Sequence, residues 1–419
     1  MDWMAGKELD RQDVMAKYKE EFFVEKDTIY MDGNSLGLMS KRAEAKLHSV
    51  MESWKTFGID GWTEGEHPWF TLAEDMSTRI APLVGAKAHE VMVTGSITSN
   101  IHQMLSTLFQ PTPERFAILV DDLNFPSDIY AVESHLRLRG LDPSKALKKV
   151  GSRDGYTLQL EDIIEQLTDN IAILLLPSVL YRSGQLLEIR EITEAAHKKG
   201  ILVGFDLAHS IGAMPHQLHD DGVDFAIWCH YKYMNSGPGG TGGLYIHERH
   251  HHLLPGNAGW FGSDKTRQFD MDHEFSKAQG AGAYQIGTPH IFSMAPLLGS
   301  LELFEEAGIQ TVRQKSLQLT ALLRKLVNQQ IPELTDVTPE QDDKRGGHIA
   351  LAHPEAARIC KALKKAKIIP DFRAPNIIRL APIAFYTSFS DVEQVVAKLQ
   401  DIMENETYKN FSNERNVVA

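Results

Sequence analysis

Cysteine is scarce in this chain, with two residues among 419, Cys229 and Cys360. Two thiols cannot build a disulfide framework or a multi-thiolate metal site. Positive charge is also in deficit, because 43 basic side chains stand against 56 acidic ones and give a net charge of −13 at pH 7. That sign is wrong for a nucleic-acid-binding surface.

Long apolar runs are missing as well. No stretch reaches the ~18 apolar residues of a membrane span, and the opening MDWMAGKELDRQD lacks the apolar region of a secretion signal. We therefore expect a cytoplasmic protein that binds neither a membrane nor nucleic acid. The rest of the composition, 42% hydrophobic and 24% charged, is that of an ordinary globular protein. At roughly 150 residues per domain, the length predicts two to three domains and the size of a metabolic enzyme.

The middle of the chain alternates short apolar runs with amphipathic stretches. This pattern is typical of a parallel sheet with crossover helices. Helices are predicted over Leu187–Lys199, which Gly200 ends, and over Ile101–Leu108, which follows a hydroxyl-rich run. The predicted buried strands are Phe116–Val120, Ile171–Leu176, Ile201–Phe205, Val223–Trp228 and Leu244–Ile246.

A second α/β set follows Pro296. A long helical stretch, Leu297–Ile331, is expected to break at Gly308, and the last helix is expected to open with the capping box Ser390-Asp-Val-Glu393. We predict an α/β fold with a large domain over residues 1–295, a mostly parallel sheet sandwiched by helices, and a smaller C-terminal α/β domain over residues 296–419. The N-terminal segment is a candidate to pack on the small domain. The elements predicted for the small domain are strand His348–Ala352, helix Pro354–Lys365, strand Ile377–Leu380 and helix Asp391–Met403.

Two charged residues mark the ends of neighbouring predicted strands. Asp206 ends one strand, and Lys232 follows the next after a three-residue turn. The carboxyl ends of parallel strands are where open α/β sheets bind ligands. A lysine that forms a Schiff base and a carboxylate that pairs with a pyridinium nitrogen would suit pyridoxal 5'-phosphate (PLP). From position alone, a structural ion pair is the better explanation of the two residues, because such pairs are common.

The local sequences favour the cofactor. Asp206-Leu-Ala-His209, Tyr231-Lys232-Tyr and the Gly-rich turn 237–243 together resemble fold-type I PLP enzymes, which have the aspartate aminotransferase architecture. Five motifs, in the order of the family and spread from about residue 30 to 390, resemble kynureninase. They are Met31-Asp-Gly-Asn-Ser-Leu-Gly37, Phe125-Pro-Ser-Asp128, Trp228-Cys-His-Tyr-Lys232-Tyr, Gly259-Trp-Phe-Gly262 and Ile378-Arg-Leu-Ala-Pro382.

This resemblance implies an activity. Kynureninases hydrolyse the Cβ–Cγ bond of L-kynurenine to anthranilate and L-alanine, in tryptophan catabolism by the kynurenine pathway, which is linked to NAD biosynthesis. It also implies three catalytic residues. Lys232 would remove the first proton, Asp206 would keep the ring nitrogen protonated, and Tyr231 would be the acid that supplies Cβ.

Further cofactor contacts follow from the resemblance, one residue at a time. Phe125 would stack on the pyridine face, and the amide and hydroxyl of Ile97 and Thr98 would hold the phosphate at a helix N-terminus. The remaining cofactor contacts are Asp128, Ser178 and His209 from the same chain, and Trp260 and Thr288 from a neighbouring subunit. Structural readings stay open for several of them, since Asp128 could cap a helix and His209 could be a satisfied core histidine. A homodimer is implied.

Substrate contacts are implied too. Arg379 resembles the arginine that binds the substrate α-carboxylate, and Asn34 and Ser35 lie close to the substrate in the family. Trp62 stands where the vertebrate-type enzymes have histidine, and Thr288 where they have asparagine. A tryptophan packs an unsubstituted ring but offers nothing to a ring hydroxyl. We therefore expect L-kynurenine to be preferred over 3-hydroxykynurenine.

Two other functions and a metal site are possible alternatives. A cysteine desulfurase or selenocysteine lyase shares the fold but needs a mobile reactive cysteine, which neither Cys229 nor Cys360 offers. A scaffold that has lost its cofactor would have no use for the four residues Asp206, Lys232, Arg379 and Thr98 together. We expect no metal at His247 and His250–His252, because consecutive side chains diverge and no carboxylate or thiol set completes a site; a solvated charged turn explains them better.

Overall fold

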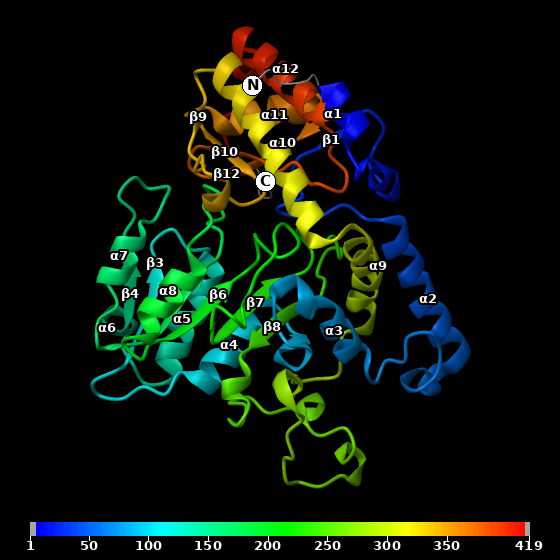
Figure 1. Cartoon of the computed structure of the whole chain (residues 1–419), viewed down its shortest axis with the longest axis vertical. Coiled ribbons are helices and arrows are strands. Elements are labelled where there is room, and N and C mark those ends of the chain that lie inside the picture. The colour runs from blue at the N-terminus through cyan, green and yellow to red at the C-terminus, as the bar shows by residue number, and fades with distance from the viewer. Residues whose placement is uncertain (1–5, 415–419) are drawn as a thin grey trace.

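The computed structural model describes residues 6–414, which form a seven-stranded, a four-stranded and a two-stranded sheet with helices around them (Figure 1). The large sheet has the order β2-β8-β7-β6-β5-β3-β4. The five predicted strands are present as β3, β5, β6, β7 and β8, with ends that shift by one or two residues. The bounds are β2 (Val91–Val93), β3 (Ala117–Asp121), β4 (Leu147–Val150), β5 (Ile171–Pro177), β6 (Leu202–Asp206), β7 (Phe225–Cys229) and β8 (Gly242–Ile246).

The large sheet is parallel from β4 to β7 and antiparallel at its other edge. β6 pairs parallel with both β5 and β7, whereas β8 pairs antiparallel with β7 and with β2. The reason lies in the connections, because a parallel neighbour requires a crossover, usually a helix. The segment between β7 and β8 is the Gly-rich turn, without a helix, so the chain returns in the opposite direction.

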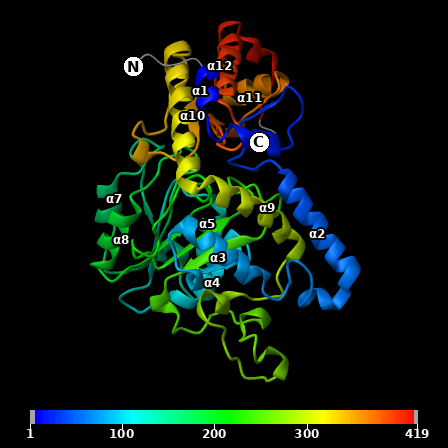
Figure 2. The same cartoon turned by 45° about the vertical axis from the view of Figure 1, so that its right-hand side comes forward.

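Helices surround this sheet (Figure 2). α2 lies along α9 in both views, and α4 packs on α5. The helices of this part are α2 (Lys41–Phe57), α3 (Leu72–Val84), α4 (Ile97–Leu108), α5 (Pro126–Leu138), α6 (Pro143–Ala146), α7 (Leu160–Glu165), α8 (Ile189–His197) and α9 (Ile291–Ala307). Short 3-10 turns between β8 and α9 project from the large sheet, away from α12 (Figure 1).

The predicted break at Gly308 is confirmed, since α9 ends at Ala307 and α10 (Ile309–Gln330) begins directly afterwards. Gly308 has φ 76, in the left-handed region that glycine enters without a steric penalty. The predicted capping box of the last helix is wrong. α12 (Phe389–Glu404) is capped by Ser388 with Asp391, while Glu393 instead accepts a hydrogen bond from the backbone N–H of Gly6 at 2.7 Å.

The C-terminal part has its own sheet and its own hydrophobic core. Its antiparallel sheet has the order β12-β13-β10-β9, and β1 pairs parallel with β11. α1 lies beside α12, and Asp10 accepts the N–H of Phe389 at 2.7 Å (Figure 1). The bounds are α1 (Gly6–Gln12), β1 (Ile29–Tyr30), β9 (Thr335–Asp336), β10 (Ile349–Ala352), α11 (Ala356–Lys365), β11 (Ile368–Ile369), β12 (Asp371–Arg373) and β13 (Ile377–Leu380).

The two main hydrophobic cores meet within α10. Val312 belongs to the core of the large sheet and Leu319 to the core of the C-terminal part. The division of α10 between the two cores favours a domain boundary inside this helix. The boundary predicted at residue 296 stays a prediction. No helix within residues 6–414 is long and apolar enough to cross a membrane.

Candidate active site

A cavity of about 280 Å³ lies at the carboxyl ends of β6 and β7, where the N-terminus of α4 also points. This is the sheet edge that open α/β folds use for ligands. Eleven of the residues that the sequence assigned to the site line it. They are Asn34, Ser35, Ile97, Thr98, Phe125, Asp128, Asp206, His209, Tyr231, Lys232 and Arg379.

Two carboxyl groups share the floor of the cavity. Asp206 is buried at the end of β6, and Asp128 is buried in the first turn of α5. Burial raises the pKa of Asp206 even though the charge of Lys232 opposes it, and burial together with the charge of Asp206 raises the pKa of Asp128 well above its usual range. Asp128 Oδ2 has no hydrogen-bond partner among residues 6–414. The raised pKa values mean that the two carboxyl groups can share a proton, with Asp128 as the donor to Asp206. A positively charged ring nitrogen bound beside the pair would favour the ionised form of Asp206.

Lys232 reaches the cavity from the turn after β7. Its Nζ lies 3.1 Å from Nε2 of His209. Burial, then the charge of Lys232, holds the pKa of His209 far below its ordinary value, so the imidazole is neutral and accepts a hydrogen bond from the lysine. Nδ1 of His209 lacks a partner within the described part of the chain.

Two aromatic side chains stand near Lys232. Its Nζ lies 5.9 Å from the ring centroid of Tyr231 and 6.0 Å from that of Phe125. Burial raises the pKa of Tyr231, so the phenol keeps its proton at neutral pH. Phe125 is 41% exposed and meets Tyr181 edge to face, with ring centroids 5.2 Å apart. Its ring is thus free to cover a planar ligand.

The first turn of α4 forms an anion-binding end of the cavity. Ser96 caps this helix, and its hydroxyl accepts the N–H of Ser99. The first N–H groups of a helix have no intrahelical partner, and the helix dipole favours negative charge there. Ile97 and Thr98 occupy that turn and line the cavity. A phosphate would find backbone donors and a hydroxyl at this place.

The opposite wall is built from an arginine pair. Arg379 is 1% exposed, forms an ion pair with Asp371, and donates to Ser35 Oγ at 3.0 Å. Arg373 contacts the same two partners, with its Nη2 3.1 Å from Ser35 Oγ. The cavity wall thus presents two guanidinium groups, which suits a carboxylate ligand.

Arg373 and Asp371 were missed by the sequence analysis. The antiparallel pairing places Asp371 opposite Arg379. The alternation Asp371-Phe-Arg373, directly before the turn 374–376, was the available signal, because residues two apart share one face of a strand. Asn34 adds a further polar group, since it is fully buried and both side-chain polar atoms lack a partner among the described residues.

Four assigned residues lie outside this cavity. Ser178 is fully buried, and its hydroxyl meets Ser210 Oγ at 2.7 Å and the Asp206 backbone oxygen at 3.1 Å. It supports the end of β6 instead of facing the cavity. Trp62 packs against Phe261, Trp260 is 43% exposed, and Thr288 lines a separate hollow.

The two cysteines are both buried. Cys229 lines the cavity, but burial raises the pKa of its thiol, which therefore stays protonated. Cys360 lies in the core of the C-terminal part, and burial raises the pKa of its thiol far above the usual range. Neither thiol has the exposure and low pKa of a reactive cysteine.

Comparison with known proteins gives relatives along the whole chain. Residues 312–399 match the model of the kynureninase C-terminal domain. The chain is 56% identical to kynureninase of Geobacillus thermodenitrificans (strain NG80-2) over 416 residues, which cover 99% of this chain and 97% of that protein. It is 55% identical to kynureninase of Bacillus anthracis over 414 residues, which cover 98% and 97% of the two chains.

Solved structures with the same fold are more distant in sequence. A cysteine desulfurase from Thermococcus onnurineus NA1 superposes with a TM-score of 0.79 at 18% identity, covering 93% of this chain and 98% of its own. A variant of the protein C-DES, with glycine covalently linked to its PLP cofactor, reaches a TM-score of 0.80 at 19% identity, covering 91% and 99%. These similarities concern the fold alone, and they confirm the predicted α/β fold class.

Proposed function

Because the chain belongs to the kynureninase family, we propose that it binds PLP and hydrolyses the Cβ–Cγ bond of L-kynurenine, giving anthranilate and L-alanine. One observation carries the proposal: Lys232, Asp206 and Arg379 line a single cavity. The cavity also fits the cofactor. It has the buried carboxyl pair Asp206 and Asp128 for a protonated ring nitrogen, and the first turn of α4 for a phosphate.

When bound, PLP supplies an aldehyde that captures amines and a ring that accepts electrons. Asp206 and Asp128 hold the ring nitrogen in its protonated form. Phe125 covers the ring, and Thr98 binds the phosphate. Arg379 orients the substrate through its α-carboxylate.

Lys232 removes the proton from Cα of the substrate. Its Nζ can return to His209 Nε2, 3.1 Å away, and the neutral imidazole gives the lysine a fixed position. Water then adds to the γ-carbonyl carbon, the hydrate loses a proton to solvent, and the Cβ–Cγ bond breaks with its electron pair passing to Cβ. Lys232 later returns its proton to Cα, which completes L-alanine. Tyr231 donates a proton at Cβ, a role that suits a phenol whose pKa burial has raised. The carboxyl carbon of anthranilate keeps the oxygen of the added water.

The direct test is an incubation of purified protein with PLP and L-kynurenine. We expect anthranilate and alanine in equal amounts, and a yellow protein whose visible absorbance disappears in Lys232→Ala. Turnover by Lys232→Ala at the wild-type rate would overturn the assignment. Sulfide release from cysteine without anthranilate from kynurenine would instead favour the desulfurase reading.

The preference for L-kynurenine over 3-hydroxykynurenine is part of the proposal. Trp62 and Thr288 are the residues expected to set it, because neither indole nor a short hydroxyl matches the imidazole and amide of the vertebrate-type pair. Comparison of kcat/KM for the two substrates tests this. A higher value for the hydroxylated substrate would contradict it, as would an unchanged ratio in Trp62→His.

We also propose a homodimer whose sites are completed across the interface. Trp62, Trp260 and Thr288 lie outside the cavity of their own chain, so a second chain would have to bring them to a site. Exposed aromatic side chains such as Trp54 (60%) and Phe292 (45%) provide apolar surface for that contact. The molar mass in solution tests the dimer. A mixture of Lys232→Ala and Trp62→Ala chains should exceed the summed activity of the separate variants, and no gain would exclude shared sites.

The role in tryptophan catabolism and NAD biosynthesis, and the cytoplasmic location, stay predictions. Growth on tryptophan after deletion of the gene tests the first, and cell fractionation tests the second.

A further inference from the structure

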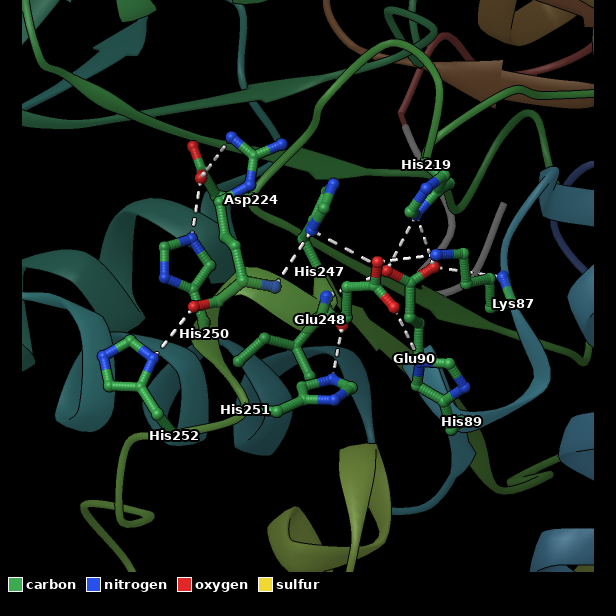
Figure 3. Close-up of polar contacts among 12 residues, drawn as sticks. Lys87, His89, Glu90, His219, Asp224, His247, Glu248, His250, His251 and His252 are labelled. Atoms are coloured by element: carbon green, nitrogen blue, oxygen red, sulfur yellow. Dashed lines mark hydrogen bonds and ion pairs between the residues drawn. The ribbon is translucent and has the colours of Figure 1, made fainter.

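Histidine and carboxylate side chains gather at the opposite end of the large sheet from the cavity (Figure 3). They come from the residues just before β2 and β7 and just after β8, which all meet at this edge. The sequence predicts no metal at His247, and no observation tests that prediction, but the structure places a carboxylate, that of Glu90, beside this histidine. The sequence could not show this, since the pairing of β2 with β8 is what brings the two residues together.

Three of these side chains converge on one point. Nδ1 of His219 lies 2.9 Å and 3.1 Å from the two carboxylate oxygens of Glu90, and Nδ1 of His247 lies 3.7 Å from the nearer one. One ligand atom from each residue lies within 4.8 Å of the other two. Ligand atoms around a tetrahedral zinc ion are roughly 3.3 Å apart, because each bond is about 2.0 Å long. The triad therefore has to contract to surround an ion. The rings of His219 and His247 are also nearly parallel, at 22° with centroids 4.8 Å apart, so they have to turn until both Nδ1 lone pairs face the ion.

We propose that Glu90, His219 and His247 bind a divalent transition-metal ion, with Zn²⁺ as the best match. Two imidazoles and one carboxylate are borderline ligands that suit Zn²⁺ better than Ca²⁺ or Mg²⁺, which prefer oxygen. A water molecule would complete the fourth position. Access is open, because 24% of the His219 side chain and 11% of the His247 side chain are exposed.

Backbone hydrogen bonds fix the carboxylate of the triad. The N–H groups of Glu248 (2.8 Å) and Lys87 (3.0 Å) each donate to a different oxygen of Glu90. The carboxylate is thus held in one orientation by its surroundings, as a metal ligand should be.

Metal binding would replace two hydrogen bonds. A carboxylate only accepts hydrogen bonds, so His219 Nδ1 carries the proton that faces Glu90. When the ion binds Nδ1, that proton leaves to solvent and the partly exposed Nε2 takes one up, so the imidazole stays neutral in its other tautomer. Nδ1 of His247 accepts the backbone N–H of Arg249 at 3.1 Å, and the ion would replace that bond. The freed N–H opens a three-residue 3-10 turn at the surface, where water can take over.

The neighbouring carboxylate is arranged differently. Asp224 also contacts two imidazoles, but His197 binds its Oδ2 at 2.8 Å and His250 binds its Oδ1 at 2.7 Å. The imidazoles thus approach different oxygens of one carboxylate, and Nη1 of Arg249 lies 3.8 Å from Oδ1. Asp224 therefore already has a cation beside it and serves as a structural hydrogen-bond acceptor. Glu90 has no such arginine contact within residues 6–414, which makes it the better metal ligand of the two.

Binding of Zn²⁺ to the holoenzyme tests the proposal. After chelator treatment, calorimetric titration with ZnCl₂ should give one site per chain, and CoCl₂ should give the visible spectrum of a tetrahedral Co²⁺ site. His219→Gln, at a partly exposed position, should weaken Zn²⁺ binding at least tenfold. The matched controls are His252→Gln and His89→Gln, two exposed histidines of the same cluster, and they should bind within about twofold of wild type.

Several results would overturn the proposal. They are no binding by the wild type, equal binding by wild type and His219→Gln, or a loss in His89→Gln that His219→Gln does not share. The last result would place the ion on His89 and Glu248, which lie 3.0 Å apart. Should His219→Gln fail to fold, His247→Asn is used instead, because asparagine can still accept the Arg249 N–H and removes only the imidazole.

Discussion

Asp371 is the shared counter-charge of the arginine pair in the cavity wall, and its replacement gives a sharp test of that wall. Its carboxyl group is fully buried and pairs with Nε of Arg379 and, at 3.0 Å, with Nε of Arg373. Asp371→Asn keeps the shape of the side chain and removes its charge. Two neighbouring guanidinium groups then face one another without a carboxylate between them.

The expected effect follows from burial. Loss of one partner of a buried ion pair destabilises a protein by about 3–5 kcal/mol. The side chain of Arg379 is 1% exposed but that of Arg373 is 30% exposed, so water screens part of the lost interaction. We therefore expect a loss of about 3 kcal/mol in the free energy of unfolding. Arg379 loses the carboxylate that holds its Nε and keeps only the Tyr181 backbone oxygen and Ser35 Oγ as partners, so its guanidinium is less firmly placed. KM for kynurenine should therefore rise about tenfold, or about 1.4 kcal/mol of binding, with a smaller fall in kcat.

Urea unfolding of the holoenzyme measures the first effect, and steady-state kinetics measures the second. Glu306→Gln is the control, because Glu306 pairs with Arg42 at 2.6 Å but its side chain is 50% exposed. Such a surface pair contributes at most about 1 kcal/mol. A loss below about 1 kcal/mol in Asp371→Asn, with an unchanged KM, would refute the reasoning that this carboxylate holds the substrate-binding arginine in place.

Three further predictions concern other residues. Tyr231→Phe should lower kcat for anthranilate release by about 10²-fold or more, because Cβ loses its proton donor, and a nearly unchanged kcat would assign that proton to another group. Asp224 has a pKa of about 2, since hydrogen bonds from His197 and His250 outweigh the upward shift from burial, and this adds about 2 kcal/mol to the free energy of unfolding above pH 4, which is lost as the pH falls from 4 to 2. In denaturant titrations, Asp224→Asn should therefore have a lower free energy of unfolding at pH 7 and a weaker pH dependence of it between pH 4 and 2. The same pH dependence in variant and wild type would contradict this. Cys229→Ser should keep kcat/KM within about threefold, because its buried thiol is protonated and takes no part in the reaction, and loss of activity would revive the desulfurase mechanism.

Much of the fold was readable from local patterns. Short apolar runs predicted β3, β5, β6, β7 and β8, because a strand buried on both faces is apolar along its whole length. Gly308 predicted the break between α9 and α10. The start of α12 was misplaced by two residues, because Ser388 and Ser390 both suit a cap. Contact with α1 decided between them, since Asp10 occupies the Ser390 hydroxyl and N–H.

The candidate site was predictable where motifs end strands or begin helices. Asp206, Lys232 and Thr98 meet in one cavity because the carboxyl ends of parallel strands share one edge of a sheet. Arg373 was missed because its own strand, β12, was not part of any motif, although the paired strand β13 was. Trp62, Trp260 and Thr288 lie outside the cavity of a single chain, so a second chain would have to bring them to a site.

The sequence by itself determined the order of strands and helices along the chain, the chemistry at their ends and the family to which the chain belongs. Those features depend on residues close together in the chain. The tertiary structure alone decided that Asp371 lies between two arginines and that Glu90 faces His219 from 129 residues away. The physical reason is that burial and hydrogen-bond partners depend on how distant segments pack, and spacing along the chain does not encode that packing.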